Sequence, residues 1–246
     1  MLPKIMVTDK IDESKKMKEM CADRKGIVAQ MTEYKNQLHT ILHKIFGDEY
    51  ETTVSYKDIF CIKAIQEWKK ILDTDKDYLN KRALLKITQM EISNNELKLI
   101  NDEIKRIERT NEDIQLLVSI PGCGIVSACE IMGEIKDIER FASSAKLAKY
   151  SALAPRNHSS GSKTRHYTDK RGNRILNRSI FQIAFTQIGK QGTEKSRKYY
   201  KKKVQEGKSK MHAIRCLKRQ LVDVIYRVLK SRKTYSMLED SLVKTL

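Results

Sequence analysis

The sequence predicts a mainly α-helical protein, in which a long coiled-coil-like helical pair is followed by a compact helical domain that contains a helix-hairpin-helix. Three observations predict this fold class: apolar residues recur at heptad spacing, only three prolines interrupt 246 residues, and alternating strand patterns are scarce. A chain of this length suffices for one or two domains with a substantial core.

Two seams of apolar residues predict the helical pair. In residues 24–46 the seam positions are Ile27, Met31, Tyr34, Leu38, Ile41 and Ile45. A second seam runs from Leu79 to Ile114 and includes Asn94 and Asn111, which would help to set register and oligomer number. The seams fit an intramolecular antiparallel bundle and a coiled coil between subunits equally well. Either arrangement predicts a spacer at residues 21–112.

A hydrophobic segment, a Pro-Gly-x-Gly turn and a helix follow the second seam. Gly122 and Gly124 permit a close approach of the backbone, so the first amides of the following helix can hold a phosphate. This pattern indicates a helix-hairpin-helix, and an ordinary helix-helix turn with a glycine cap has the same pattern. We predict that it opens a domain at residues 113–235, with a tail at residues 236–246.

The stretch from Ser151 to Phe185 places a serine among cations. Ser159 and Ser160 precede Gly161 in a predicted turn, and helical spacing resumes after Asn173. The cations of this stretch include Lys163, Arg165, Lys170, Arg171, Arg174 and Arg178. A hydroxyl among cations at a helix start suits attack on a phosphodiester, because the developing charge is stabilised there. The alternative is a loop that only contacts the DNA backbone.

The net charge of +18 belongs to one segment of the chain. Residues 156–233 contain 23 lysines and arginines and four acids, whereas the remaining residues are close to neutral. Such a segment is expected to bind a polyanion. No apolar run reaches the roughly 20 residues that cross a bilayer, and the N-terminal residues lack a signal-peptide core. We therefore expect a cytoplasmic protein without a membrane partner.

Cysteine, histidine and tyrosine patterns add weaker indications. The five cysteines contain no C-x-x-C pair, which argues against a disulfide framework and a zinc knuckle. His39 and His43 have helical metal-ligand spacing, but without an accompanying acid a solvated helix face is favoured. Tyr199 and Tyr200, beside three lysines, either stack on nucleic acid or belong to a solvated basic helix.

Three ordered motifs resemble the IS116/IS110/IS902 family of insertion-sequence transposases. They are IPGCGIVSACEIMGEI at residues 120–135, RFASSAKLAKYSALAP at residues 140–155 and SSG…DKRGNRILNRSIFQIA at residues 159–184, and residues 24–42 resemble the linker helix of the family. The resemblance implies DNA recombination through a covalent phosphoserine link. It also implies homo-oligomeric assembly on DNA, guided in some members by an element-encoded RNA.

The resemblance further implies site residues and a metal. Ser160 corresponds to the nucleophilic serine, and Ser159 is the weaker candidate. Family members carry an N-terminal RuvC-like domain with four acids that bind a divalent metal, here Mg²⁺. Asp9 and Asp12, in a T-D-x-x-D pattern, correspond to the last two acids. We therefore expect residues 1–20 to be a remnant of that domain in a truncated copy, with an incomplete metal site.

The sequence leaves two classes of function open. The first is a serine-dependent DNA transposase or recombinase, in which His158 or His166 is the candidate base. In this reading the arginines that follow the loop hold the phosphate, although Asn177 stands where the family usually has arginine. The second is a basic, non-catalytic protein that binds DNA or RNA and assembles with full-length transposase.

Overall fold

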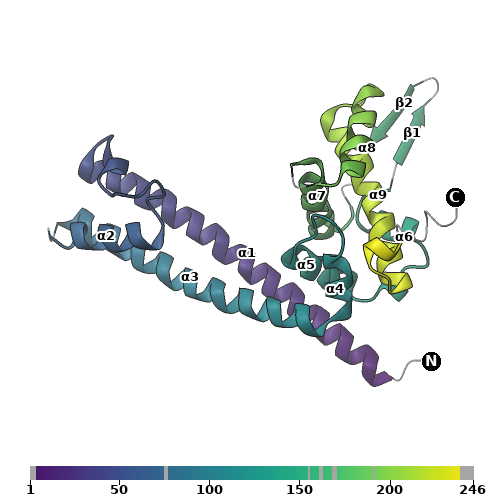
Figure 1. Cartoon of the computed structure of the whole chain (residues 1–246), viewed down its shortest axis with the longest axis horizontal. Helices are drawn as coiled ribbons and strands as arrows, with labels where there is room; N and C mark the ends of the chain where they lie inside the picture. The colour runs from purple at the N-terminus through teal and green to yellow at the C-terminus, as the bar shows by residue number, and fades with distance from the viewer. Residues whose placement is uncertain are drawn as a thin grey trace. The chain divides into compact units, whose positions relative to one another are not determined.

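The computed structural model confirms the mainly α-helical fold class (Figure 1). It describes residues 4–74, 77–154, 156–160, 163–167, 171–190 and 192–238, and for residues 4–11, 156–160 and 163–167 it describes the backbone alone. No helix in this described part is both long enough and apolar enough to cross a membrane. The chain divides into two compact units: Ala22–Glu103, and Met1–Cys21 together with Ile104–Leu246.

Three helices form the unit Ala22–Glu103. They are α1 (Lys4–Phe46), α2 (Ile62–Leu72) and α3 (Tyr78–Thr110), with a short 3-10 turn, η1 (Tyr50–Thr52), after α1. Within this unit α1 and α3 run antiparallel and are connected through α2 (Figure 1). Helix α1 passes without a break through residues 20 and 21, where the sequence predicted the border between a domain remnant and the spacer.

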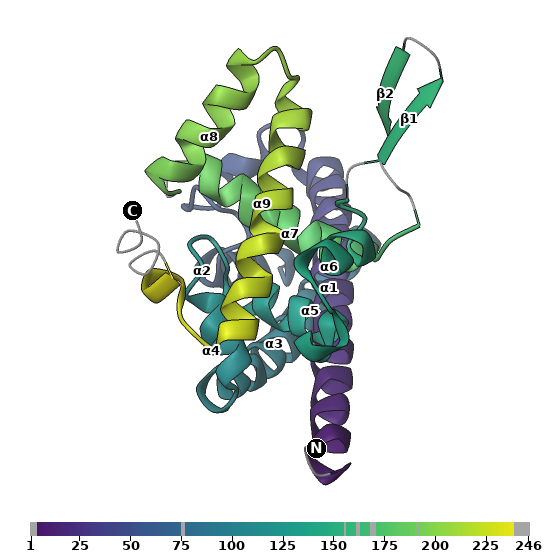
Figure 2. The same cartoon turned by 90° about the vertical axis from the view of Figure 1, so that its right-hand side faces the viewer.

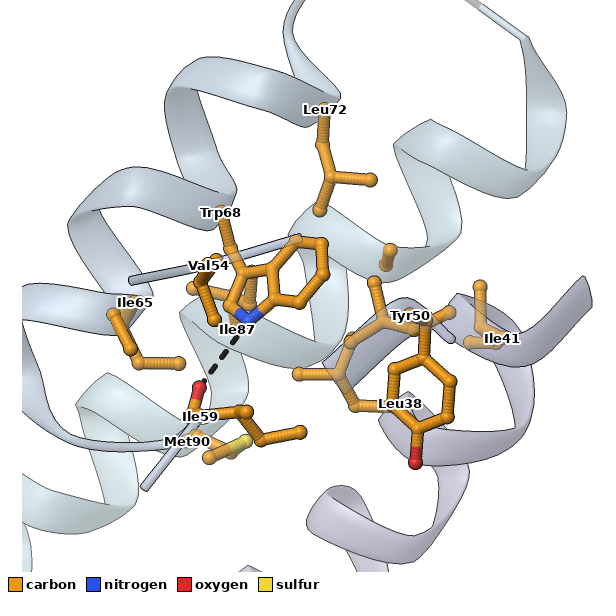
Figure 3. Close-up of a cluster of buried hydrophobic side chains, with 13 residues drawn as sticks. Leu38, Ile41, Tyr50, Val54, Ile59, Ile65, Trp68, Leu72, Ile87 and Met90 are labelled. Carbon is orange, nitrogen blue, oxygen red and sulfur yellow. Dashed lines mark hydrogen bonds between the residues drawn. The ribbon is translucent and has the colours of Figure 1, made fainter. Parts of the chain in front are cut away.

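Trp68 of α2 organises the core of this unit (Figure 3). Its side chain is fully buried, and its Nε1 donates a hydrogen bond to the carbonyl oxygen of Ile59 at 3.2 Å. The surrounding side chains include Leu38 and Ile41 of the first predicted seam and Ala83, Ile87 and Met90 of the second, and Leu42 of α1 joins them from outside the seam. At this end of the unit the two seams therefore meet within one chain.

Neither seam asparagine is among the buried residues of this chain. Asn94 is exposed on α3. Asn111 lies between α3 and α4 (Glu112–Val118), where its extended backbone and its side-chain oxygen, which accepts from the N–H of Ile114 at 3.1 Å, make it the N-cap of α4. A short acceptor side chain satisfies a helix end better than an apolar interface, which explains this difference from the prediction.

The second unit is built around α9 (Lys210–Ser231). It also contains α5 (Ile125–Ile135), η2 (Ile138–Arg140), α6 (Ser144–Tyr150), α7 (Arg174–Ile188) and α8 (Glu194–Gln205). Helices α4, α6, α7 and α8 all contact α9 (Figure 2). The predicted apolar face of α9 is buried at Ile214, Leu217, Leu221, Ile225, Val228 and Leu229. This face holds the unit together.

Polar caps define where the helices of this unit begin. Side-chain oxygens accept from helix N–H groups at Ser143, Asn173, Thr193 and Ser209, the caps of α6, α7, α8 and α9. The sequence predicted that helical spacing resumes after Asn173, and the start of α7 at Arg174 confirms this. Helices α4 and α5 flank the Pro-Gly-x-Gly turn, and the helix-hairpin-helix assignment of this pair stays a prediction.

A two-stranded hairpin lies where the sequence predicted a turn. Strands β1 (Arg156–Ser160) and β2 (Lys163–Tyr167) pair antiparallel, with Ser160 opposite Lys163 and His158 opposite Arg165. Ser159 and Ser160 are thus strand residues, and Gly161 lies outside the described residues. A two-residue connection is the usual length for a tight hairpin. The pattern was not recognised because these strands contain no alternation of apolar residues.

Replacing Trp68 by alanine is expected to destabilise the unit Ala22–Glu103 by about 3 to 5 kcal/mol, because it removes the largest buried side chain and leaves a cavity. Hydrogen exchange followed by mass spectrometry measures this loss within the unit. Ile62→Ala is the matched control on α2, since Ile62 is 73% exposed and its truncation should change stability by less than about 0.5 kcal/mol. Equal exchange in both variants would contradict the assignment of Trp68 to the core.

Candidate functional site

The segment between α6 and α7 carries the β-hairpin, and its two ends are held together. The N–H of Asn173 donates to the carbonyl of Tyr150 at 2.8 Å, and Nδ2 of Asn177 donates to the carbonyl of Ser151 at 2.7 Å. A Cβ at Gly172 would lie 2.5 Å from the backbone nitrogen of Ala152, so only glycine permits this approach. We call this set the hairpin neck: Tyr150, Ser151, Ala152, Gly172, Asn173 and Asn177.

A buried carboxylate on α5 holds the neck in place. Glu134 is 5% exposed, and its Oε2 accepts a hydrogen bond from Nδ2 of Asn173 at 2.5 Å. Its Oε1 lies 3.1 Å from Nζ of Lys18, the one cation that the described residues place against it. The hydroxyl of Tyr150 accepts from Asn173 at 3.2 Å and donates to the carbonyl of Glu134 at 3.3 Å. Since Asn173 also caps α7 through Leu176, Glu134 fixes the start of that helix.

Lys218 of α9 also contacts the neck, at Asn177. It is 7% exposed, its Nζ donates to Oδ1 of Asn177 at 2.5 Å, and the Nζ lies 5.6 Å from the ring centroid of Phe181. Burial, with a smaller contribution from the charge of Arg215, lowers the pKa of Lys218 to about 8. Lys218 is thus a buried lysine of α9.

The Pro-Gly-x-Gly turn is anchored to α7 by a buried amide. Nε2 of Gln187 donates to the carbonyl of Pro121 at 2.6 Å, and Oε1 of Gln187 accepts from the hydroxyl of Ser196 on α8 at 2.7 Å. Gly122 has a φ of +82°, and a Cβ there would lie 3.3 Å from the carbonyl oxygen of Ile183. Gly122 is therefore required by the turn and by its contact with α7.

Gly124 has a different environment from Gly122. It is the N-cap of α5, where it supplies no side-chain acceptor, and its φ of −78° suits any residue. A Cβ at Gly124 would meet no atom within 4 Å. This glycine borders an open groove of about 680 Å³ between the turn and α7, which is also lined by Gly122, Ser127, Phe181, Gln182, Phe185 and Thr186.

The cysteine of the glycine turn is unsuited to nucleophilic chemistry. Burial raises the pKa of Cys123 to about 12, and the pKa of Cys129 on α5 rises to about 12 for the same reason. A thiol with such a pKa stays protonated near neutral pH, and the thiolate is the reactive form. Both cysteines therefore contribute packing.

The acids of the basic segment pair with local lysines and arginines. Glu194 lies 2.8 Å from Lys198, and Asp223 lies 2.7 Å from Arg219. Glu206 accepts from two lysines of its own turn, and these contacts hold its pKa at about 2. Helix α7 has no acid at all, and within the described residues neither Arg174 nor Arg178 forms an ion pair with one. Arg174 and Arg178 therefore give the start of α7 an exposed positive surface next to the neck.

The predicted DNA-binding residues are only partly brought together. Arg174 and Arg178 lie one helical turn apart at the start of α7, and the exposed Arg171 lies just before it. Lys163 and Arg165 are backbone positions of β2, and Lys170 lies outside the described residues. Gly122 and Gly124 lie in the turn before α5, which the bond from Gln187 ties to α7.

The predicted metal ligands do not form a complete site. Asp9 and Asp12 both belong to α1, where Asp12 is exposed and the side chain of Asp9 lies outside the described residues. The described side chains contain no group of three or more acids, histidines or cysteines that could hold an ion. Two carboxylates on one helix leave most positions of an octahedral Mg²⁺ ion unfilled. The residues present therefore do not fit this metal by themselves.

Three other candidates have structural partners. His39 is half-buried and hydrogen-bonded to the hydroxyl of Tyr50, and His43 pairs with Asp48 at 2.7 Å. Tyr199 lies half-buried between α8 and α9 and carries a hydrogen bond with Gln220. These contacts explain the histidines as structural, and they leave Tyr199 less available for stacking than the sequence pattern suggested.

Residues 114–201, from α4 into α8, match the model of the transposase IS116/IS110/IS902 family. The matched segment contains the glycine turn, the neck, the hairpin and the start of α7. It therefore confirms the resemblance that the sequence motifs indicated.

Individual relatives match over the same part of the chain. The insertion element IS116 uncharacterized 44.8 kDa protein of Streptomyces clavuligerus is 31% identical over 54% of this chain and 33% of its own length. The transposase for insertion sequence element IS1111A of Coxiella burnetii is 40% identical over 30% of this chain and 21% of its own length. The pilin gene-inverting protein of Moraxella bovis is 29% identical over 51% of this chain and 39% of its own length. The chain thus matches well under half of each of these relatives.

Asn173→Asp is expected to destabilise the neck in a pH-dependent manner. The substitution keeps the cap of α7 but places a second carboxylate against Glu134, so one of the two must bind a proton in the folded state. The folded protein then binds more protons than the unfolded protein, and stability falls as the pH rises from about 4 to 7. Thermal unfolding of the variant and wild type across this pH range measures the difference.

The double variant Asn173→Asp with Glu134→Gln is the matched control. It exchanges donor and acceptor between the two positions, so much of the lost stability and the flat pH profile should return. A single variant whose stability does not change with pH would contradict the role assigned to Glu134.

Proposed function

Because residues 114–201 of this chain match the model of the IS116/IS110/IS902 transposase family, we propose that the chain acts on DNA as a transposase or recombinase with Ser160 as its nucleophile. The observation that carries the proposal is the hairpin neck, which ties both ends of the strand pair containing Ser160 to the basic start of α7. Arg174 and Arg178, which would bind the phosphate, are therefore close in sequence to the residues that join the hairpin to α7.

The strand register supports Ser160 over Ser159. Alternate residues of a strand belong to opposite faces of the ladder, and directly paired residues share a face. Ser160 pairs with Lys163, and His158 pairs with Arg165, so these four positions belong to one face. Ser159 belongs to the other. In the ladder, the position of Ser160 thus shares a face with the positions of His158, Lys163 and Arg165, whereas that of Ser159 does not.

The proposed step exchanges one phosphate ester for another. The Ser160 hydroxyl oxygen attacks the phosphorus of a DNA phosphodiester, its proton passes to His158, and the bond from phosphorus to one deoxyribose oxygen breaks. That oxygen leaves as a hydroxyl by taking a proton. Rejoining is the reverse reaction with a hydroxyl of the recombining strand. Arg165, Arg174 and Arg178 stabilise the negative charge that develops on the phosphate.

A second candidate function is nucleic-acid binding without strand cleavage. The exposed Arg174 and Arg178 support it, because they can hold a phosphate backbone whether or not a strand is cut. In this case the chain would occupy DNA, or an element-encoded RNA, and assemble with longer relatives. The two candidates differ in whether a covalent link to DNA forms.

Ser160→Ala is expected to abolish a covalent protein-DNA adduct. The assay incubates the full chain with nicked duplexes from the DNA that flanks its own gene, with Mg²⁺, and detects an adduct that survives denaturation and is removed by protease. Ser159→Ala is the matched control and should retain the adduct, because the register assigns it to the other face. If the wild-type chain binds DNA in a salt-dependent manner but forms no adduct, only the non-catalytic binding function remains.

Neutralising Arg174 and Arg178 is expected to weaken DNA binding and to reduce its salt dependence. If each arginine contacts one phosphate, the double Arg→Gln variant should lower the slope of log affinity against log salt by about 2. Fluorescence anisotropy on a duplex at several salt concentrations measures this slope. The control variant, Lys198→Gln with Lys230→Gln, removes the same charge from residues paired with Glu194 and Glu139, and should change the slope less.

A further inference from the structure

The exposed face of α7 combines arginines with aromatic rings. Arg174, Arg178, Gln182 and Phe185 are exposed and spaced at intervals of four, four and three residues, which puts them on one side of the helix. Phe185 is 60% exposed, an unusual state for such a side chain, and it stacks on Phe181 with ring centroids 6.0 Å apart and 23° between the planes. We call Phe181 and Phe185 the aromatic pair.

The aromatic pair lines the open groove beside the glycine turn. The opposite side of this groove is backbone at Gly122 and Gly124, and the space next to Gly124 is empty enough to admit a Cβ without contact. Neither the φ of Gly124 nor its packing requires a glycine. Phe185 is 60% exposed although Phe181 stacks on it, and the groove of about 680 Å³ has room for a ligand between the ring and the glycine turn.

We propose that this groove binds unpaired nucleotides of a nucleic-acid strand, with bases stacked on Phe185 and the backbone phosphates held by Arg178 and Arg174. The inference rests on the proposed function, since it names the form of nucleic acid that the same surface accepts. Base faces are hidden inside a duplex and become available only in unpaired strands. An exposed aromatic ring beside arginines is therefore suited to a single strand rather than to a double helix.

Charge decides between a nucleic acid and a protein partner for this face. Helix α7 contributes two arginines and no acid, and residues 156–233 together have 23 basic residues and four acids. The described acids nearest in sequence, Glu194 and Glu206, are paired with their own lysines. A second copy of the chain would bring the same positive surface and be repelled, whereas a phosphate backbone is complementary to it.

The test compares binding of the full chain to three labelled probes of equal length: single-stranded oligothymidylate, single-stranded oligouridylate and a blunt DNA duplex. Phe185→Ala should lower affinity for the preferred single strand about tenfold and leave duplex affinity unchanged. Phe185→Trp should retain single-strand affinity, because the larger ring still stacks. Met211→Ala, which truncates a side chain that is 53% exposed on α9, is the matched control and should change neither affinity.

The salt dependence separates stacking from charge. Phe185→Ala should lower single-strand affinity equally at all salt concentrations, whereas Arg178→Gln should flatten the salt slope. The preferred single strand, DNA or RNA, identifies the source of the bound nucleotides. Circular dichroism verifies that each variant folds.

Three outcomes would overturn the inference. The first is equal single-strand affinity of Phe185→Ala and wild type, and the second is an equal loss on single strand and duplex. The third is loss of self-association in sedimentation with unchanged single-strand affinity, which would assign the aromatic pair to an interface between copies. Duplex binding that survives in the first or third case preserves the proposed function. A wild-type chain that binds none of the probes would overturn both.

Discussion

The contact between Glu134 and Asn173 is the interaction on which the arrangement of this unit depends. A buried carboxylate is costly unless hydrogen bonds and an opposite charge compensate it. Here Asn173 and Lys18 supply that compensation. Because Asn173 also caps α7, the same contact determines where α7 begins. The contact between Glu134 and Asn173 therefore helps to fix where the hairpin joins α7 and where Arg174 and Arg178 lie.

The buried Lys218 also holds the hairpin neck, through Asn177. No described carboxylate pairs with its ammonium group, which is held by the amide oxygen of Asn177 and by the ring of Phe181. Asn177 in turn closes the neck at Ser151. Lys218 thus places a cation of α9 next to the neck.

The positive surface results from the small number of acids and from their pairing with neighbouring lysines and arginines. The four acids of residues 156–233 are few, and the three of them that the structure describes, Glu194, Glu206 and Asp223, pair within their own helices or turns. Such pairs contribute little to stability at an exposed surface. The acids of α5 that touch α7, Glu130 and Glu134, are hydrogen-bonded to Ser179 and Asn173, whereas Arg174 and Arg178 have no acidic partner among the described residues. The two arginines, the aromatic pair and the glycine turn together suit the backbone and the bases of a nucleic acid.

Local sequence properties determined much of this protein. Apolar periodicity predicted the helices, including the start of helical spacing after Asn173, and composition located the charge, because each of these depends on neighbours in the chain. The strand pair escaped prediction since it lacks apolar alternation. Asn94 and Asn111 were assigned to a seam because spacing alone does not report exposure or a helix end.

Tertiary structure decided which residues surround the site. Glu134 meets Asn173 across 39 residues and Lys218 meets Asn177 across 41, and no periodic pattern connects such positions. The same holds for Gln187, whose amide secures the glycine turn across 66 residues. Burial changes the chemistry of these polar groups, and burial arises only when distant helices pack. The sequence therefore determined the candidate chemistry, and the packing of α5, α7 and α9 determined which side chains position it.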